Sequence, residues 1–77
     1  MTVQYRVVVA KQDERVEGPD DAAVVLSVGI EIAAAADFDA TVEYMRGRLK
    51  ATGRNGAVLS ELKSGQATTA LHRLAQA

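Results

Sequence analysis

The chain has 77 residues, of which 48% are hydrophobic, and a formal net charge of −1; this size and composition predict one small folded domain, residues 1–77, and not a disordered segment. The near-balanced charge argues against an overall electrostatic attraction to nucleic acid or anionic membranes. The absence of cysteine excludes a disulfide scaffold, a catalytic thiol and a thiolate metal site, and it fits the reducing cytoplasm in which we expect the protein to work.

The first third of the chain predicts three strands. Residues 2–11 carry apolar side chains at period two, which is typical of a half-buried strand. Residues 11–14 predict a hairpin loop, and residues 15–17 a short return strand. The sequence GPDD at residues 18–21 predicts a turn, because glycine is permissive, proline fixes φ and aspartate can bond its own backbone. Residues 22–28 predict a third strand, whose nearly continuous apolar run indicates burial on both faces.

Helical spacing begins after the third strand. Residues 29–36 predict two short helical turns. Asp37 is then the predicted N-cap of a helix, with Asp39 adding negative charge to its first turn. Gly47 is expected to end that helix in the C′ position. The predicted apolar face of the helix consists of Phe38, Val42 and Met45.

The remaining chain predicts one more strand and a helical C-terminus. Residues 48–52 predict the strand, which Gly53 closes. Asn55 is the predicted N-cap of the following helix, and Ser64–Gly65 interrupts that helix. The apolar positions of this region are Val58, Leu59, Leu62, Ala67, Ala70, Leu71 and Leu74. The order β-β-β-α-α-β-α predicts an α+β domain, with a mostly antiparallel sheet of three to four strands and helices on one face.

A basic segment between the second helix and the last strand has two interpretations. Arg46, Arg48 and Lys50 stand two residues apart. In a strand, Arg48 and Lys50 would point to one side and Leu49 and Ala51 to the other. The segment is then either a solvated basic face over a core leucine, or the wall of a cleft in which a cation contacts an anionic head group.

Signatures of catalysis, metal binding and membrane insertion are missing. The single His72 is predicted to be a surface residue or one that compensates the dipole near the end of the last helix. One histidine without cysteine leaves too few ligands for a transition metal. The acid pairs at residues 13–14 and 20–21 lie in predicted turns. The longest apolar run, residues 22–36, is interrupted by polar residues and too short for a membrane-spanning helix. We therefore predict a protein that is not an enzyme and uses no cofactor.

Two stretches, VEGPDDAAVVLSV and FDATVEYMRGRLKATGRNGAVLSELKSG, resemble the sterol carrier protein type-2 domain family. That family has a GPD turn into a strand, then a helix ending in an aromatic–Met pair that is followed by Gly, Leu, Lys and Gly. The matching positions are Gly18, Pro19, Asp20, Ala23, Val25, Leu26, Tyr44, Met45, Gly47, Leu49, Lys50 and Gly53. Tyr44 stands where phenylalanine is common. The resemblance covers residues 16 to about 62.

The resemblance implies an α+β fold with a hydrophobic tunnel that binds sterols, fatty acids or acyl chains without catalysis. Family members usually carry an N-terminal helix and further strands before the first strand predicted here. The chain therefore resembles the C-terminal two-thirds of such a domain. The expected apolar lining consists of Leu26, Ile30, Phe38, Val42, Met45, Leu49, Val58 and Leu62. Arg48 or Lys50 is expected to contact the polar head group.

An empty pocket is difficult to reconcile with so short a chain. A cavity of about 300 Å³ would cost roughly 7 kcal/mol, and a chain of this length has about 4–12 kcal/mol of total stability. The pocket is then small, filled by ligand, or closed by a second chain. Because exposed sheet edges invite pairing, we expect a homodimer. The many alanines and the preference for arginine over lysine indicate a bacterial genome of high GC content.

Two other functions stay open. The first is protein–protein interaction or assembly through an exposed apolar helix face, expected along Val58, Leu62, Leu71 and Leu74. The second is nucleic-acid binding through Arg46, Arg48, Lys50 and Arg54. The net negative charge and the lack of aromatic residues between these cations argue against nucleic-acid binding.

Overall fold

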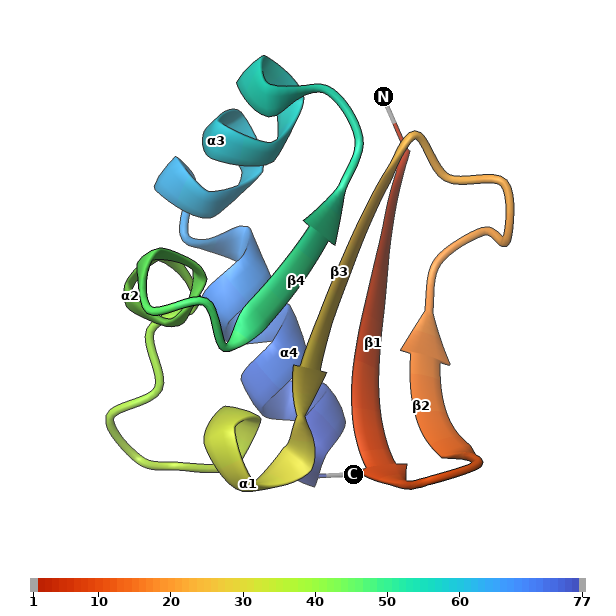
Figure 1. The fold of residues 1–77 in the computed structure, drawn as a ribbon, viewed down its shortest axis with the longest axis vertical. Helices are drawn as coiled ribbons and strands as arrows, with labels where there is room; N and C mark the ends of the chain where they lie inside the picture. The colour runs from red at the N-terminus through yellow and green to blue at the C-terminus, as the bar shows by residue number, and fades with distance from the viewer. Residues whose placement is uncertain (1, 77) are drawn as a thin grey trace.

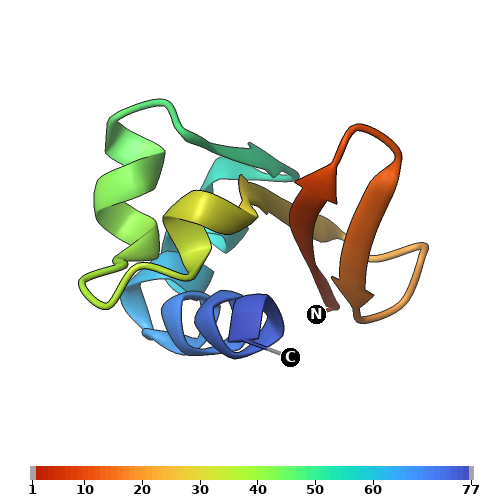
Figure 2. The same cartoon turned by 90° about the horizontal axis from the view of Figure 1, so that it is seen from below.

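The computed structural model describes residues 2–76, in which a four-stranded sheet is covered on one face by helices (Figure 1, Figure 2). The α+β class and the predicted order of elements are confirmed, with the final helical region divided at Ser64–Gly65. The elements are β1 (Val3–Ala10), β2 (Asp13–Glu17), β3 (Val24–Gly29), α1 (Ile30–Ala33), α2 (Ala40–Met45), β4 (Leu49–Thr52), α3 (Asn55–Lys63) and α4 (Gln66–Gln76).

The strands lie side by side in the order β2-β1-β3-β4. β1 is antiparallel to β2 and β3 is antiparallel to β4, whereas β1 and β3 are parallel. The sheet is thus mostly antiparallel, as predicted, with a parallel pair at its centre. This pair arises because β2 returns the chain to the end where β1 begins. Residues 18–23 then pass that end of β1 and start β3 on its far side (Figure 1).

The β1–β2 hairpin is tighter than predicted. β2 begins at Asp13, which pairs with Ala10, so the loop consists of Lys11 and Gln12 alone. The register is irregular between Val8 and Ala10. The acidic residues at 13–14 therefore belong to a strand and not to the loop.

The helices cover only one face of the sheet (Figure 2). In β3, Val24, Leu26 and Val28 are buried in the core, whereas Val25 and Ser27 on the other face are half-buried. The predicted burial of this strand on both faces is therefore wrong. Among the described residues no second helical layer covers the other face, and only neighbouring side chains shield it.

Two glycines permit close backbone approaches at strand ends. Gly18 follows β2 in the predicted turn and has a φ of +113°; a Cβ there would meet the carbonyl oxygen of Val3. Gly53 follows β4 with a φ of +128°, and a Cβ there would lie 2.6 Å from the carbonyl oxygen of Ala23. Positive φ and close backbone neighbours together favour glycine at both positions. The predicted turn and the predicted end of the last strand are thus confirmed.

Helix α2 ends in a Schellman motif. Gly47, at a φ of +77°, donates its N–H to the carbonyl oxygen of Tyr44 over 3.1 Å, and Arg48 donates to that of Glu43 over 2.9 Å. These bonds satisfy carbonyl groups that the last helical turn leaves open. The predicted glycine stop is confirmed.

The N-cap predictions were wrong by one or two residues. Asp39, and not Asp37, caps α2, because it stands immediately before the first helical residue. Its carboxylate there accepts hydrogen bonds from the N–H groups of Thr41 and Val42. Asn55 is the first residue of α3 and makes no cap.

The predicted apolar face of α2 does not form. The helix buries Ala40 and Glu43, whereas Val42 and Met45 are 37% and 78% exposed. Phe38 is buried, but it lies in the connection before the helix. The spacing of Phe38, Val42 and Met45 therefore does not describe one side of a helix, since only two of the three are helical.

The core lies between the sheet and the helices. Leu26 of β3 and Leu71 of α4 are completely buried, and Val58 and Leu62 of α3 join the same cluster. Leu59, predicted on this face, is instead 50% exposed. No helix within residues 2–76 is long and apolar enough to cross a membrane.

Candidate functional site

The structure divides the predicted ligand-lining residues between core and surface. Most of them are core residues that pack against one another, whereas Val42 and Met45 of α2 point outward. The buried members are Leu26, Phe38, Leu49, Val58 and Leu62, with Ile30 half-buried beside them. Side chains therefore fill the space in which the tunnel was expected, and the predicted set does not surround one common cleft.

The two predicted head-group contacts are also separated. Arg48 precedes β4 and turns toward α2, where its Nε lies 2.6 Å from Glu43 Oε1 and its Nη2 donates to Oε2 over 3.2 Å. Lys50 is exposed and lies opposite Ser27 in the register of β3 and β4. Because Ser27 belongs to the uncovered face of the sheet, Arg48 and Lys50 do not converge on one anionic group.

Glu43 is a buried carboxylate that the sequence reasoning did not single out. The residue is 7% exposed, and Arg46 Nη1 lies 3.7 Å from its Oε2. Its Oε1 has the close contact with Arg48 but makes no hydrogen bond within the described residues. The available signal was the placement of cations three and five residues after it, since a cation at i+3 of a helix meets the acid.

A small hollow of about 200 Å³ lies beside this ion pair, between α1, the connection to α2, and α2 itself. Its apolar lining comes from Ile32, Ala35 and Phe38, and its charged rim includes Glu31 and Asp37. Ligand pockets start at about 300 Å³, so this hollow is small for a lipid. Phe38 and Arg48 are the members of the predicted site that line it.

A larger hollow of about 380 Å³ opens at the start of α4. None of the predicted site residues lines it. Its lining consists of Tyr5, Glu17, Ser64, Gly65, Gln66, Thr69, Ala70 and Arg73. The volume lies at the lower end of the range for small-molecule sites, but six of the eight lining residues carry polar or charged side chains, so the hollow lacks the aliphatic lining that an acyl chain or a sterol requires.

Tyr5 and Glu61 form a partly buried hydrogen bond next to the larger hollow. The Tyr5 hydroxyl donates to the Glu61 carboxylate, and Glu61 is buried. Burial and this hydrogen bond raise the pKa of Tyr5 well above its ordinary value. Tyr5 therefore keeps its proton at neutral pH and acts as a hydrogen-bond donor, which does not make it a base or a nucleophile.

His72 has an internal contact and not the predicted surface position. Its Nδ1 lies 2.8 Å from the carbonyl oxygen of Ala33, and the side chain is half-buried. The contact joins α4 to α1, because the side chain faces the neighbouring helix. Within residues 2–76 no group of three or more histidine, cysteine or acidic side chains is placed to hold a metal ion.

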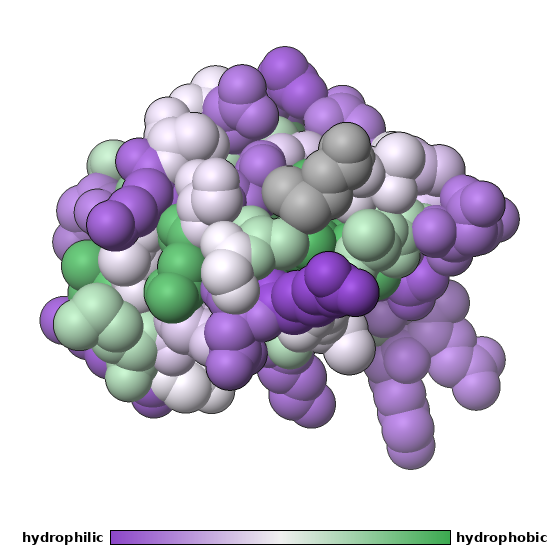
Figure 3. Space-filling model, turned by 90° about the horizontal axis from the view of Figure 1, so that it is seen from above, coloured by the Kyte–Doolittle hydropathy of each residue, from purple (hydrophilic) through white to green (hydrophobic). Residues whose placement is uncertain are grey.

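Exposed apolar side chains concentrate on α2 and α3. Met45, Val42 and Leu59 are 78%, 37% and 50% exposed, and Val16 of β2 is 44% exposed. Seen from above, apolar residues gather on the side of α2 and α3, whereas the side of the β1–β2 hairpin is mostly hydrophilic (Figure 3).

The helix face that the sequence predicted for protein interaction is buried in the structure. Val58, Leu62 and Leu71 are buried and Leu74 is half-buried, so the predicted exposure of this face is wrong. The reason is that these residues belong to or pack against the core cluster between the sheet and the helices.

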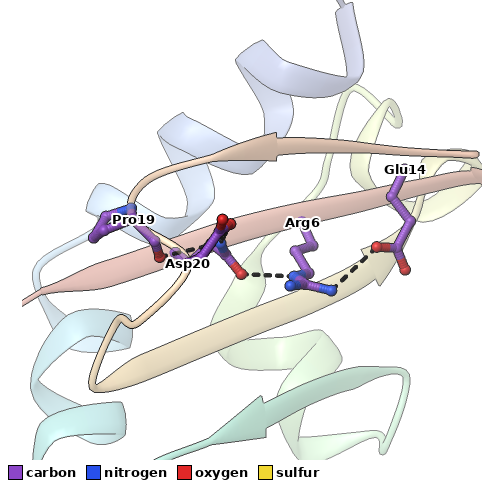
Figure 4. Close-up of polar contacts among 5 residues, drawn as sticks. Arg6, Glu14, Pro19 and Asp20 are labelled. Atoms are coloured by element: carbon purple, nitrogen blue, oxygen red, sulfur yellow. Dashed lines mark hydrogen bonds and ion pairs between the residues drawn. The ribbon is translucent and has the colours of Figure 1, made fainter.

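A polar network on the uncovered face anchors the connection between β2 and β3. Gln4 is completely buried, and its Nε2 donates to the Pro19 carbonyl over 3.1 Å and to Asp20 Oδ1 over 3.3 Å (Figure 4). Gln4 Oε1 accepts from Arg6 Nε over 2.6 Å, and Arg6 Nη1 contacts Glu14 Oε2 at 3.2 Å. The amide thus has partners on both of its ends, and the network holds the turn against β1.

No protein-family model, no curated protein and no solved structure matches this chain. The resemblance to sterol carrier protein type-2 domains therefore stays a prediction.

Proposed function

We propose that the chain is a non-catalytic, cytoplasmic protein-interaction module that contacts a partner protein through the exposed apolar residues of α2 and α3. The observation that supports this is the exposure of Met45, Val42 and Leu59 on these two helices. In a domain with few large apolar residues, these side chains are kept out of the core while alanines occupy buried positions such as Ala40 and Ala67.

The expected contact energy is sufficient for a specific but modest interaction. Complete burial of one Leu, Val or Met side chain contributes about 1.5–3 kcal/mol, before the cost of association is subtracted. Methionine suits such a face because its side chain adapts to different partner shapes. The basic Arg46, which follows Met45 and is 61% exposed in its side chain, adds preference for a partner with an acidic group beside its apolar contact.

Binding of a lipid-like molecule is the competing hypothesis, and it stays a prediction. Side chains fill the space between the sheet and the helices, and the larger hollow is lined mostly by residues with polar or charged side chains and not by aliphatic ones. Native mass spectrometry of the purified protein, before and after organic extraction, tests this hypothesis directly. A lipid-sized adduct that extraction removes would favour the carrier function over the interaction module.

The test of the interaction module uses a photo-crosslinking amino acid at position 45, expressed in the native host. The matched control carries the same amino acid at position 16, because Val16 is also exposed but lies on the sheet. We expect one protein other than this chain to be crosslinked from position 45 and not from position 16. That protein is then purified and titrated against the wild-type chain by calorimetry.

Serine substitutions at the exposed apolar residues test whether these residues make the contact. Met45→Ser should weaken binding of the purified partner by about tenfold, which is the effect of losing about 1.4 kcal/mol, and Val42→Ser should weaken it less, because Val42 is only 37% exposed before binding. Val16→Ser should leave the affinity unchanged. Equal crosslinking from both positions, or a purified partner whose affinity is the same for Met45→Ser and wild type, would refute the proposed function.

A further inference from the structure

Two nine-residue segments of the chain carry opposite charge. Residues 13–21, DERVEGPDD, contain five acids and one arginine, a net charge of −4. Residues 46–54, RGRLKATGR, contain four cations and no acid, a net charge of +4. The overall charge of −1 therefore conceals a strong separation of charge along the chain.

The fold places the strands of the two segments at opposite edges of the sheet, and residues 18–21 continue from the end of β2 and are bonded to Gln4 of β1. Residues 13–21 contain β2, residues 46–54 contain β4, and these two strands are the first and last in the order β2-β1-β3-β4 (Figure 1). Three strand spacings of about 4.8 Å separate them, or about 14 Å. We call them the acidic edge (residues 13–21) and the basic edge (residues 46–54).

Both edges keep charge that no internal ion pair neutralises. Within residues 2–76, Asp13 and Asp21 on the acidic edge are exposed and make no ion pair, and the same holds for Lys50 and Arg54 on the basic edge. The other two cations of the basic edge share a single carboxylate, that of Glu43. The basic edge thus retains a net positive charge and the acidic edge a net negative charge.

We propose that a second copy of this chain binds here, its acidic edge against the basic edge of the first. Contact between two acidic edges, or between two basic edges, would bring like charges together, so only opposite edges are complementary. β2 and β4 also run in the same direction, since each is antiparallel to one strand of the parallel central pair. A head-to-tail contact of this kind leaves one free edge at each end, so the assembly grows by addition of further copies.

This inference depends on charge placement and not on the apolar residues of α2 and α3, so it stands or falls separately from the proposed function. Sedimentation velocity of the full chain measures it. At about 20 mM salt the screening length is about 20 Å, and at about 500 mM it is about 4 Å. We expect species larger than the 8.2 kDa monomer at low salt, and a fall of at least about tenfold in the association constant at high salt.

Two neutralised variants test the pairing of edges. Lys50→Gln with Arg54→Gln lowers the positive charge of the basic edge by two, and Asp13→Asn with Asp21→Asn lowers the negative charge of the acidic edge by two. Each variant alone should be a monomer at low salt. An equal mixture should form a one-to-one dimer and nothing larger, because each variant keeps one functional edge. All four side chains are exposed, and circular dichroism verifies that the variants remain folded.

Lys11→Gln is the matched control. It removes a cation from the hairpin loop, outside both edges, and should leave assembly intact. A wild-type chain that stays monomeric at low salt overturns the proposal, as does assembly that strengthens with salt or variants that assemble like the wild type. A mixture that forms no dimer also overturns it.

Discussion

The hydrogen bond between Tyr5 and Glu61 is expected to be a major contributor to stability. Tyr5→Phe removes the hydroxyl that donates to the Glu61 carboxylate and leaves that buried acid without its donor. A buried acceptor that loses its partner costs about 1–3 kcal/mol. At about 2.1 cal/mol/K of unfolding entropy per residue, a chain of this length loses about 6 °C of Tm per kcal/mol. We therefore expect Tm to fall by roughly 6–18 °C.

The assay is thermal and urea unfolding followed by circular dichroism. Tyr44→Phe is the matched control, because Tyr44 is half-buried and its hydroxyl makes no hydrogen bond within the described residues. It should change stability by less than about 0.5 kcal/mol. A double-mutant cycle with Glu61→Met, which removes the acceptor, isolates the pair, and we expect a coupling energy of about 1.5–3 kcal/mol. If Tyr5→Phe and Tyr44→Phe have equal effects, the bond does not stabilise the fold.

The same bond predicts a pH dependence. The pKa of Tyr5 is raised in the folded state from an ordinary value of 10.0, so the folded chain holds this proton more tightly than the unfolded chain. The stability from this group is therefore complete below pH 10 and is lost as the pH rises further. The difference in stability between wild type and Tyr5→Phe should shrink above about pH 10. A difference that stays constant from pH 8 to pH 11 would contradict the assignment.

Two further substitutions test the backbone and the uncovered face. Gly53→Ala should destabilise the chain more than Gly47→Ala, since both glycines have positive φ but only Gly53 has backbone within 3 Å of the added Cβ; equal Tm values would show that the clash relaxes freely. Gln4→Ala should cost about 1–3 kcal/mol and increase proteolysis in the turn at residues 18–21, because the turn loses both of its bonds to the amide. Limited digestion detects this, and an unchanged cleavage rate would argue against the anchoring role.

The parts of the fold that depend on neighbours in the sequence were predictable. The period-two pattern of β1 needs no distant partner, since alternation alone places its side chains on two faces. The glycine at position 47 ends α2 as predicted, because a C′ residue in the left-handed region is a local requirement. The N-cap of α2 was displaced from Asp37 to Asp39, because either acid near the helix start could take this role from the sequence alone, whereas α3 begins at Asn55 without a side-chain cap.

The positions of the candidate site residues were harder to predict from the sequence than the order of helices and strands. Arg48 and Lys50 are two residues apart and were expected on one side of a strand, but the strand begins only at Leu49. Arg48 therefore takes Glu43 as its partner, and Lys50 alone lies on the uncovered face. A displacement of one residue at the boundary of an element was sufficient to separate the predicted pair.

The sequence by itself determined the element order, the α+β class and the opposite charges of the two nine-residue segments. Only the tertiary structure decided that those segments lie at opposite edges of the sheet, because the strand order depends on pairing between distant residues. It also brought Tyr5 to Glu61 across 56 positions and His72 to Ala33 across 39. Such contacts depend on how the faces of separate elements pack together. Burial of apolar side chains in the assembled core selects that packing, and a local sequence pattern does not encode it.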